Sequence, residues 1–285
     1  MEIGVGHMDK VGFIGYGHMG SVMLKSLLAT KAIVPEQVLI TTQTKNRLHS
    51  LKDSFPGIEI ADSNSTVAKN SSMLFLCVGT SQVKSVLSEI LGVLSVATHL
   101  VIISGGLEIP SVEQLFDGPI TKLIPTIISE VHEGVTLICS NAKVSPVESN
   151  RIGEMFTRIG KIKVIAEQQF EICADFTSCA PGLLACICEQ FVRAGVKQRD
   201  IAYDDAVEMF LQTLYGTAKL LLQNGENFGE LRNRVATKGG ATEGGAAVLE
   251  AMLPAVFDIV FSTTLERHEA RKQITRQQFG RAANV

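Results

Sequence analysis

The sequence predicts an α/β protein, with a doubly wound, mostly parallel sheet in its first part and helices alone in its second part. Up to about residue 165, short apolar runs alternate with segments whose apolar residues recur at helical spacing. Strands and helices that alternate in this way form βαβ units. After about residue 166 only the helical period remains, so we expect two domains, residues 1–165 and 166–285.

The expected elements follow from the short apolar runs and from the helical spacing of apolar residues. Residues 73–78 form a continuous apolar run, which is typical of a buried parallel strand. Strands are expected at residues 11–14, 38–41, 73–78, 100–104, 120–124, 135–139 and 161–165. Helices are expected at residues 18–30, 46–54, 81–91, 146–160, 167–180, 183–194, 200–223, 228–235, 244–252 and 255–272, and residues 276–285 are expected to fray.

Composition excludes several classes of protein. The 285 residues are 46% hydrophobic, and 26 basic residues stand against 29 acidic ones. This balance argues against a nucleic-acid binder, which needs a basic excess or stripe. No uninterrupted apolar run approaches the length of a membrane span, and residues 1–10 lack the pattern of a signal peptide. We therefore expect a soluble, cytoplasmic protein with no membrane or nucleic-acid partner.

Cysteine and histidine spacing gives no sign of a metal site. The six cysteines include no C-x-x-C pair, and the six histidines include no H-x-x-x-H pair. Without a secretory signal, buried reduced thiols are the expected state of the cysteines. No metal is therefore expected.

A glycine-rich segment closes the first expected strand and opens the first expected helix. Gly-x-Gly-x-x-Gly in this context is the fingerprint of a Rossmann-type dinucleotide-binding domain. Gly15 permits the tight turn, Gly17 lets the backbone approach a pyrophosphate, and Gly20 allows close helix–strand packing. The cofactor contacts expected here are Gly15, Tyr16, Gly17, His18, Met19 and Gly20. A glycine turn in a domain without a ligand is the alternative.

The end of the second expected strand bears on the choice of dinucleotide. An NAD site usually places an acidic residue there, for the ribose hydroxyls. Here Thr42 and Gln43 follow the strand, with Lys45 and Arg47 close by and no carboxylate among them. Such chemistry suits a ribose 2′-phosphate, so NADP is favoured and NAD remains possible. A solvated helix start is the alternative.

A second glycine-rich cluster precedes a helix in the helical region. It contains Gly239, Gly240, Ala241 and Thr242. Exposed N–H groups at a helix start are suited to a carboxylate. A tight interhelical turn explains the glycines equally well. The neighbouring Glu243 is expected to cap the helix rather than to catalyse.

These motifs together resemble the pyrroline-5-carboxylate reductases over about residues 10–272. Residues 238–242, followed by 248–250, are similar to the family's glycine-glycine-(Thr/Ala)-Thr signature and its helix, and residues 11–20 are similar to its opening motif. The resemblance implies reduction of a cyclic imine with NAD(P)H, and a helical domain that joins a second subunit into a homodimer or larger assembly. It also implies that the Thr242 hydroxyl is catalytic, beside the imine nitrogen. The substrate contacts that it implies are Gly239, Gly240, Ala241, Thr242 and Thr126, and the further cofactor contacts are Val78 and Gly79.

The sequence departs from the family pattern at three places. Val78-Gly79-Thr80 replaces Val-Lys-Pro, Ile124-Pro125-Thr126 replaces Met-Pro-Asn, and Ser178-Cys179-Ala180-Pro181 replaces Gly-Ser-Gly-Pro. Losing the amide at Thr126 removes a group that both donates and accepts hydrogen bonds. The last two segments resemble the divergent late-competence reductase-like proteins of Gram-positive bacteria.

Two other functions stay open. The first is a regulatory or redox-sensing protein that binds the cofactor and has lost or altered its activity. The second is a dehydrogenase of small hydroxy acids. The related β-hydroxyacid dehydrogenases carry a catalytic lysine on the first interdomain helix, whereas residues 171–189 contain none.

Overall fold

A computed structural model of the chain describes residues 9–280, and its contacts divide the chain into two compact units. Unit 1 is formed by Met1–Ala180 together with Thr264–Val285, and unit 2 by Pro181–Thr263. The long helix α11, Ala241–Gln278, contributes residues to both units. The contacts therefore group the end of this helix with the sheet, whereas the sequence pattern divides the chain near residue 165.

Unit 1 contains an eight-stranded sheet in the order β3-β2-β1-β4-β5-β6-β7-β8. Neighbouring strands are parallel except for β6 and β7, which are antiparallel. This order, together with helices on both faces, confirms the expected Rossmann-type class. The strands are β1 Val11–Ile14, β2 Val38–Thr41, β3 Glu59–Ile60, β4 Met73–Leu76, β5 His99–Ile102, β6 Ile120–Ile124, β7 Gly134–Ser140 and β8 Gly160–Val164.

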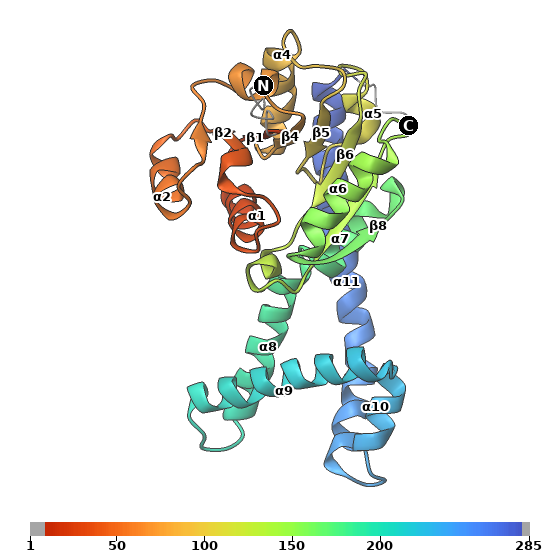
Figure 1. Ribbon diagram of the computed structural model, residues 1–285. Coiled ribbons are helices and arrows are strands. Elements are labelled where there is room, and N and C mark those ends of the chain that lie inside the picture. Colours follow the sequence, from red (N-terminus) through yellow and green to blue (C-terminus); the bar gives the residue numbers. More distant parts are fainter. Residues whose placement is uncertain (1–8, 281–285) are drawn as a thin grey trace. The chain divides into compact units, whose positions relative to one another are not determined.

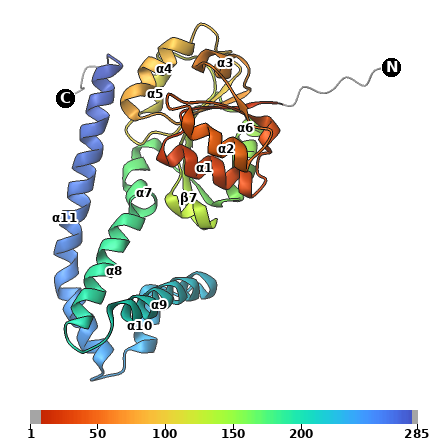
Figure 2. The same cartoon turned by 90° about the vertical axis from the view of Figure 1, so that its left-hand side faces the viewer.

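Helices cover both faces of this sheet. On one face, α1, α2 and α6 bury a core in which the Phe13 and Phe75 rings stack at 4.9 Å and Phe156 lies 6.2 Å from Phe75. Helices α3, α4 and α5 pack on the other face, and Figure 2 shows the two groups. Helix α7 covers β7 through Leu137, Phe170 and Ala174. The helices are α1 His18–Ala29, α2 Asn46–Ser54, α3 Asn64–Lys69, α4 Val83–Ile90, α5 Ile109–Val112, α6 Pro146–Thr157 and α7 Phe170–Thr177, and the short 3₁₀ turns are η1 Pro35–Gln37, η2 Thr80–Gln82, η3 Ile127–Val131 and η4 Glu167–Gln169.

Unit 2 is helical, as the sequence predicts (Figure 1). It is built from α8 Ala180–Val196, α9 Tyr203–Asn224, α10 Phe228–Val235 and the first part of α11. Among the described side chains of unit 2, Val192 is the one that is buried. By length and composition alone, the helical stretches Glu167–Val196 and Ala241–Gln278 could also cross a membrane. A helix face that packs against a second copy of the chain would be equally apolar, so length and composition do not by themselves identify a membrane span.

Two expectations for the end of the chain are wrong. Residues 244–252 and 255–272 lie in one 38-residue helix that contains Pro254. The proline removes one backbone hydrogen bond of the helix, and the turns on either side of it keep theirs. Helix α11 also continues to Gln278 instead of fraying at residue 276. Arg276 donates hydrogen bonds of 2.8 Å to both carboxylate oxygens of Glu108, which holds this last turn in place. Residues 281–285 lie outside the described part.

Buried His99 predicts a pH dependence of stability. Its Nε2 lies 2.8 Å from Thr121 Oγ1, which lies 2.8 Å from Ser140 Oγ. Burial lowers the pKa of His99 to about 4, although Glu148 opposes this shift. Between about pH 6.5 and about pH 4, His99 binds a proton in the unfolded chain but not in the folded chain. The free energy of unfolding therefore falls as the pH falls through this range.

From about pH 7.5 to about pH 5, we expect His99 to reduce the free energy of unfolding by about 2 kcal/mol. Urea unfolding at both pH values measures this change. The variant His99→Gln keeps an amide for the hydrogen bond to Thr121 but does not titrate. Its free energy of unfolding should therefore fall by about 2 kcal/mol less than that of the wild type between the two pH values. An equal pH dependence in both proteins would contradict the prediction.

Candidate functional site

The expected cofactor residues lie at the carboxyl edge of the parallel strands. Gly15 follows β1, Thr42 follows β2 and Val78 follows β4 within two residues. The order of the strands reverses between β1 and β4, since β2 and β3 lie on one side of β1 and β4 to β8 on the other. In open α/β sheets, ligands bind in the crevice at this reversal.

The three glycines of the turn after β1 have three different surroundings. Gly15 has a φ of +99°, and a Cβ there would lie 2.8 Å from the carbonyl carbon of Cys77. A Cβ on Gly20 would lie 2.9 Å from the Cβ of Cys77. At Gly17 nothing lies within 4 Å of an added Cβ. Gly15 and Gly20 are thus required by the protein's own packing, whereas the space above Gly17 is open for a ligand.

The start of α1 supplies donors for an anion. Gly17 is the N-cap residue, no side chain caps the helix, and the first turn has no acidic residue. The first N–H groups of a helix have no partner within it, so they suit a pyrophosphate. His18 is exposed and Met19 is half-buried. Tyr16 is instead buried in the core, so its side chain does not line the turn.

The segment after β2 combines hydroxyl, amide and basic groups. Thr42 is half-buried, and Gln43 and Arg47 are exposed. Lys45 Nζ lies 3.3 Å from Asp62 Oδ1, and both side chains are largely exposed, so this surface pair is weak. Helix α2 has no acidic residue in its first turn. These residues therefore fit a phosphate group on the ribose.

The turn after β4 is closed by a glutamine. Gly79 is the N-cap residue of η2, and its N–H donates to Gln82 Oε1 at 3.3 Å. The hydroxyls of Thr80 and Ser104 lie 2.8 Å apart, which links this turn to the one after β5. Val78 and Gly79 thus lie at the carboxyl end of β4, in a turn held by local hydrogen bonds.

Thr126 has an internal role in the structure. Its side chain is buried, and its Oγ1 accepts from the N–H of Ile128 at 3.4 Å and donates to the carbonyl of Thr177 at 3.3 Å. In a continuous helix, the residue at Pro181 would donate to this carbonyl, but proline has no N–H. The Thr126 hydroxyl therefore satisfies the carbonyl that Pro181 leaves free, which links Thr126, a departure from the family pattern, to a proline that the pattern shares.

In unit 2, the predicted substrate residues lie at the start of α11. Gly239 has a φ of +75°, and a Cβ on Gly240 would lie 2.5 Å from Thr237 Oγ1. The N–H of Gly240 donates to the carbonyl of Thr237 at 2.8 Å, so it is already used. Ala241 and Thr242 are exposed and form the first turn of the helix, where N–H groups have no partner within the helix.

A carboxylate of the chain itself already lies at this helix start. Glu243 Oε2 accepts from the N–H of Gly239 at 2.6 Å. This contact fits the capping role expected for Glu243, because a negative charge is favoured at the N-terminus of a helix. The same property suits the site to an anionic ligand.

Lys122 is a buried residue that the sequence did not single out. It lies in β6, with its Nζ 3.9 Å from Glu171 Oε1 and 4.3 Å from the centre of the Phe170 ring. Burial lowers the pKa of Lys122, and the charge of Glu171 opposes this shift. Helix α7 has no lysine of its own, yet a lysine reaches it from the sheet. The one sequence feature that could have pointed to Lys122 is a charged residue inside a strand that is otherwise mostly apolar.

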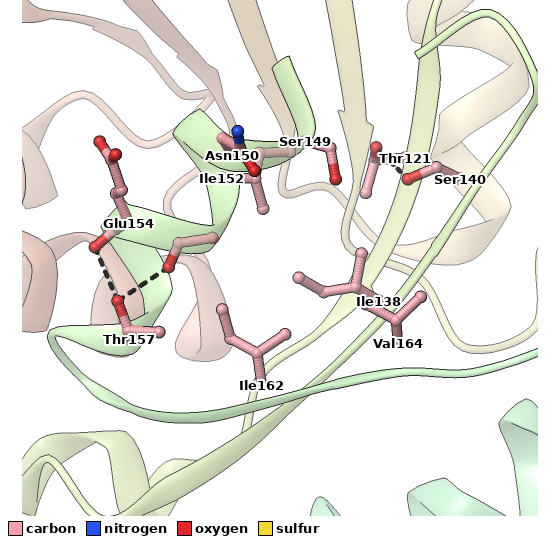
Figure 3. Close-up of a pocket in the computed structure, with 11 residues that line it drawn as sticks. Thr121, Ile138, Ser140, Ser149, Asn150, Ile152, Glu154, Thr157, Ile162 and Val164 are labelled. Carbon is pink, nitrogen blue, oxygen red and sulfur yellow. Dashed lines mark hydrogen bonds between the residues drawn. The ribbon is translucent and has the colours of Figure 1, made fainter. Parts of the chain in front are cut away.

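A cavity of about 380 Å³ lies between α6 and the last three strands of unit 1, as Figure 3 shows. It contains the hydroxyl pair of Thr121 and Ser140. None of the expected site residues lines it. The cavity is therefore separate from the carboxyl ends of β1, β2 and β4, where the expected cofactor residues lie.

Comparison with known protein families places the chain among the oxidoreductases. Residues 10–104 match the family described as NADP oxidoreductase coenzyme F420-dependent, and residues 167–271 match pyrroline-5-carboxylate reductase dimerisation. Pyrroline-5-carboxylate reductase 3 of Bacillus subtilis is 31% identical over 263 residues, which cover 92% of this chain and 96% of that protein. The chain belongs to the pyrroline-5-carboxylate reductase family.

Relatives and solved structures extend this result. ComE operon protein 4 of Bacillus subtilis is 26% identical and covers 95% of this chain and 99% of its own length, which fits the late-competence resemblance. The reductase of Coxiella burnetii has a TM-score of 0.84 at 23% identity, covering 93% of this chain and 98% of that one. The Plasmodium falciparum enzyme, with NADP bound, has a TM-score of 0.79 at 24% identity, covering 94% and 97%. The chain thus has the fold of a reductase that uses a nicotinamide cofactor.

Proposed function

We propose that this protein reduces a cyclic imine with NAD(P)H, converting 1-pyrroline-5-carboxylate to proline or reducing a related imino acid. The observation that carries the proposal is the start of α11. There Thr242 is exposed, two positions after Gly240, and the N–H group of Gly239 already binds the carboxylate of Glu243. The proposed setting is amino-acid biosynthesis in the cytoplasm.

In the proposed mechanism, two helix starts bind the two anionic ligands. The N–H groups after Gly17 hold the pyrophosphate, and those of Ala241 and Thr242 hold the substrate carboxylate. When bound, the reduced nicotinamide supplies a hydride to the carbon of the C=N bond. The Thr242 hydroxyl orients the nitrogen and forms a hydrogen bond to it as the nitrogen takes up electron density.

A panel of cyclic imines, assayed with NADPH and NADH in parallel, tests this proposal. We expect oxidation of the reduced cofactor with at least one five- or six-membered imine that carries a carboxylate. The same imine without the carboxylate should react more slowly, because it lacks the group that the start of α11 binds. Tight cofactor binding without oxidation by any imine would contradict the proposal.

The cofactor is proposed to be NADP, held by Lys45 and Arg47. Charged hydrogen bonds contribute about 1.5–3 kcal/mol each, so Lys45→Ala with Arg47→Ala should raise the KM for NADPH by at least about 100-fold. The KM for NADH should change little. Lys52→Ala, which removes a basic residue from the last turn of the same helix, is the matched control. Equal losses with both cofactors would contradict NADP preference.

Unit 2 is proposed to join a second copy of the chain. The dimerisation match spans its helices, and apolar side chains such as Met209, Leu211 and Ile259 are more than half exposed in one chain. Light scattering should give a dimer or a larger assembly without detergent. Ile259→Asp should weaken it, whereas Val147→Asp, at an exposed valine of α6, should not. A monomeric wild-type protein would contradict this assembly.

A regulatory protein that binds the cofactor without turnover is the second candidate. The observation in its favour is Thr126, whose hydroxyl bonds Ile128 and Thr177 of its own chain. The imine panel distinguishes the two functions, because this candidate predicts cofactor binding alone.

A further inference from the structure

Three side chains of different chemistry converge between α7 and the end of α11 in unit 1. They are Asp175, Cys179 and His268, and one ligand atom from each lies within 4.8 Å of the other two. The Asp175 carboxylate is fully buried, whereas His268 and Cys179 keep some exposure. Among residues 9–280, this is the group of His, Cys, Asp or Glu side chains close enough to share one ion.

The backbone between α7 and α8 brings the first two side chains together. Asp175 and Cys179 are four residues apart, which places them on one side of a helical turn. The N–H of Cys179 donates to the carbonyl of Ala174 at 2.9 Å, a bond over five residues rather than four. The Ser178 N–H donates to the same carbonyl, so this bond closes a π-turn at the C-terminal end of α7. The turn leaves the Cys179 side chain close to the Asp175 carboxylate.

The partners of the carboxylate resemble the surroundings of a metal ligand. Thr264 Oγ1 donates to Asp175 Oδ2 at 2.6 Å, and His268 Nε2 lies 2.8 Å from Asp175 Oδ1. Ligating carboxylates and imidazoles are usually held by hydrogen bonds of this kind. Thr264 fixes one oxygen and leaves the other directed toward His268.

We infer that Asp175, Cys179 and His268 bind one divalent transition-metal ion, with Zn²⁺ as the ion that fits best. Sulfur, nitrogen and carboxylate oxygen are the donors that zinc takes in proteins. Tetrahedral zinc keeps its ligand atoms about 3.4–3.6 Å apart, so His268 and Asp175 need to separate by about half an ångström. Three protein ligands leave a fourth position for water.

The charges of the three groups balance such an ion. Burial raises the pKa of the Cys179 thiol, and the Asp175 charge and hydrogen bond raise it further, with smaller opposing effects from a hydrogen bond with Ser178 and the charge of Arg271. Without an ion, the buried carboxylate shares its site with a protonated thiol. With the ion, carboxylate and thiolate together neutralise its two charges. Sequence spacing gave no sign of this site, because His268 is separated from Asp175 by 93 positions.

The test is metal titration of the purified full-length protein after treatment with a chelator. We expect one equivalent of Zn²⁺ to bind with a Kd below about 1 μM, and bound Zn²⁺ to raise the Tm. Co²⁺ in its place should give a near-ultraviolet band from thiolate-to-cobalt charge transfer. This readout does not depend on catalysis, so it stands apart from the proposed function.

Conservative variants separate a metal site from a simple ion pair. Cys179→Ser and His268→Gln should each weaken Zn²⁺ binding at least about 100-fold, and Thr264→Val should weaken it about 10- to 100-fold. Cys186→Ser, at an exposed cysteine, should leave it unchanged. Failure of Zn²⁺ to bind the folded wild-type protein would overturn the inference. Binding that survives both Cys179→Ser and His268→Gln would overturn it equally.

Discussion

Replacing Gly17 by valine should abolish cofactor binding and leave the protein folded. At this position nothing lies within 4 Å of an added Cβ, and the backbone φ of −79° suits any residue. The new side chain would occupy the space in which a pyrophosphate approaches the start of α1. We expect affinity for NADPH to fall at least about 100-fold, which corresponds to about 2.8 kcal/mol. Fluorescence titration with NADPH measures the affinity, and thermal unfolding measures the Tm.

Two other glycines are controls for this experiment. Gly92→Val places the same side chain at another open glycine and should change neither affinity nor Tm greatly. Gly20→Ala should instead destabilise the fold by about 1–3 kcal/mol, because its Cβ would meet Cys77 at 2.9 Å. If Gly17→Val binds NADPH as the wild type does, the cofactor does not use this turn.

The second large effect is expected from Thr242→Ala. Loss of one hydrogen-bonding group that acts in the transition state typically lowers kcat by about 100- to 1,000-fold. Thr242 is exposed in the first turn of α11, so its hydroxyl is available to a ligand and its loss should not affect folding. Steady-state kinetics on the best imine of the panel should show a fall in kcat with a smaller change in KM.

Serine and a distant threonine complete this test. Thr242→Ser keeps the hydroxyl and should recover most of the rate. Thr213→Ala removes a hydroxyl that bonds only the carbonyl of Met209 in the contacts described for α9, and it should be silent. Full activity in Thr242→Ala would show that the hydroxyl has no part in the reaction.

Local patterns made most of the fold predictable. The strands at 11–14, 38–41 and 120–124 have the expected bounds, because short, mostly apolar runs flanked by turns identify buried strands. β3 has two residues, too few for any period, and it was not predicted. Pro254 led to the expectation of two helices where there is one, because a single proline signals a break that the rest of a long helix can tolerate.

The candidate site was predictable only where its residues are close in sequence. The glycine turn and the start of α11 each lie within a few positions, so spacing made them candidates, and the family resemblance added the role expected of Thr242. By contrast, Lys122 meets Glu171, and Asp175 meets His268, through contacts between distant segments. Thr126 was expected at the site only from the family resemblance, and its bond to Thr177 required the structure.

Transfer of deuterium from deuterated NADPH to the product tests the central claim most directly. The protein is incubated with 1-pyrroline-5-carboxylate, and with the best imine of the panel, and the product is analysed by mass spectrometry. Reduction of the C=N bond predicts an amino acid that carries one deuterium on the former imine carbon, and no label with Gly17→Val. NADPH that binds to the wild type but remains unoxidised, with no labelled product from any imine, would contradict imine reduction.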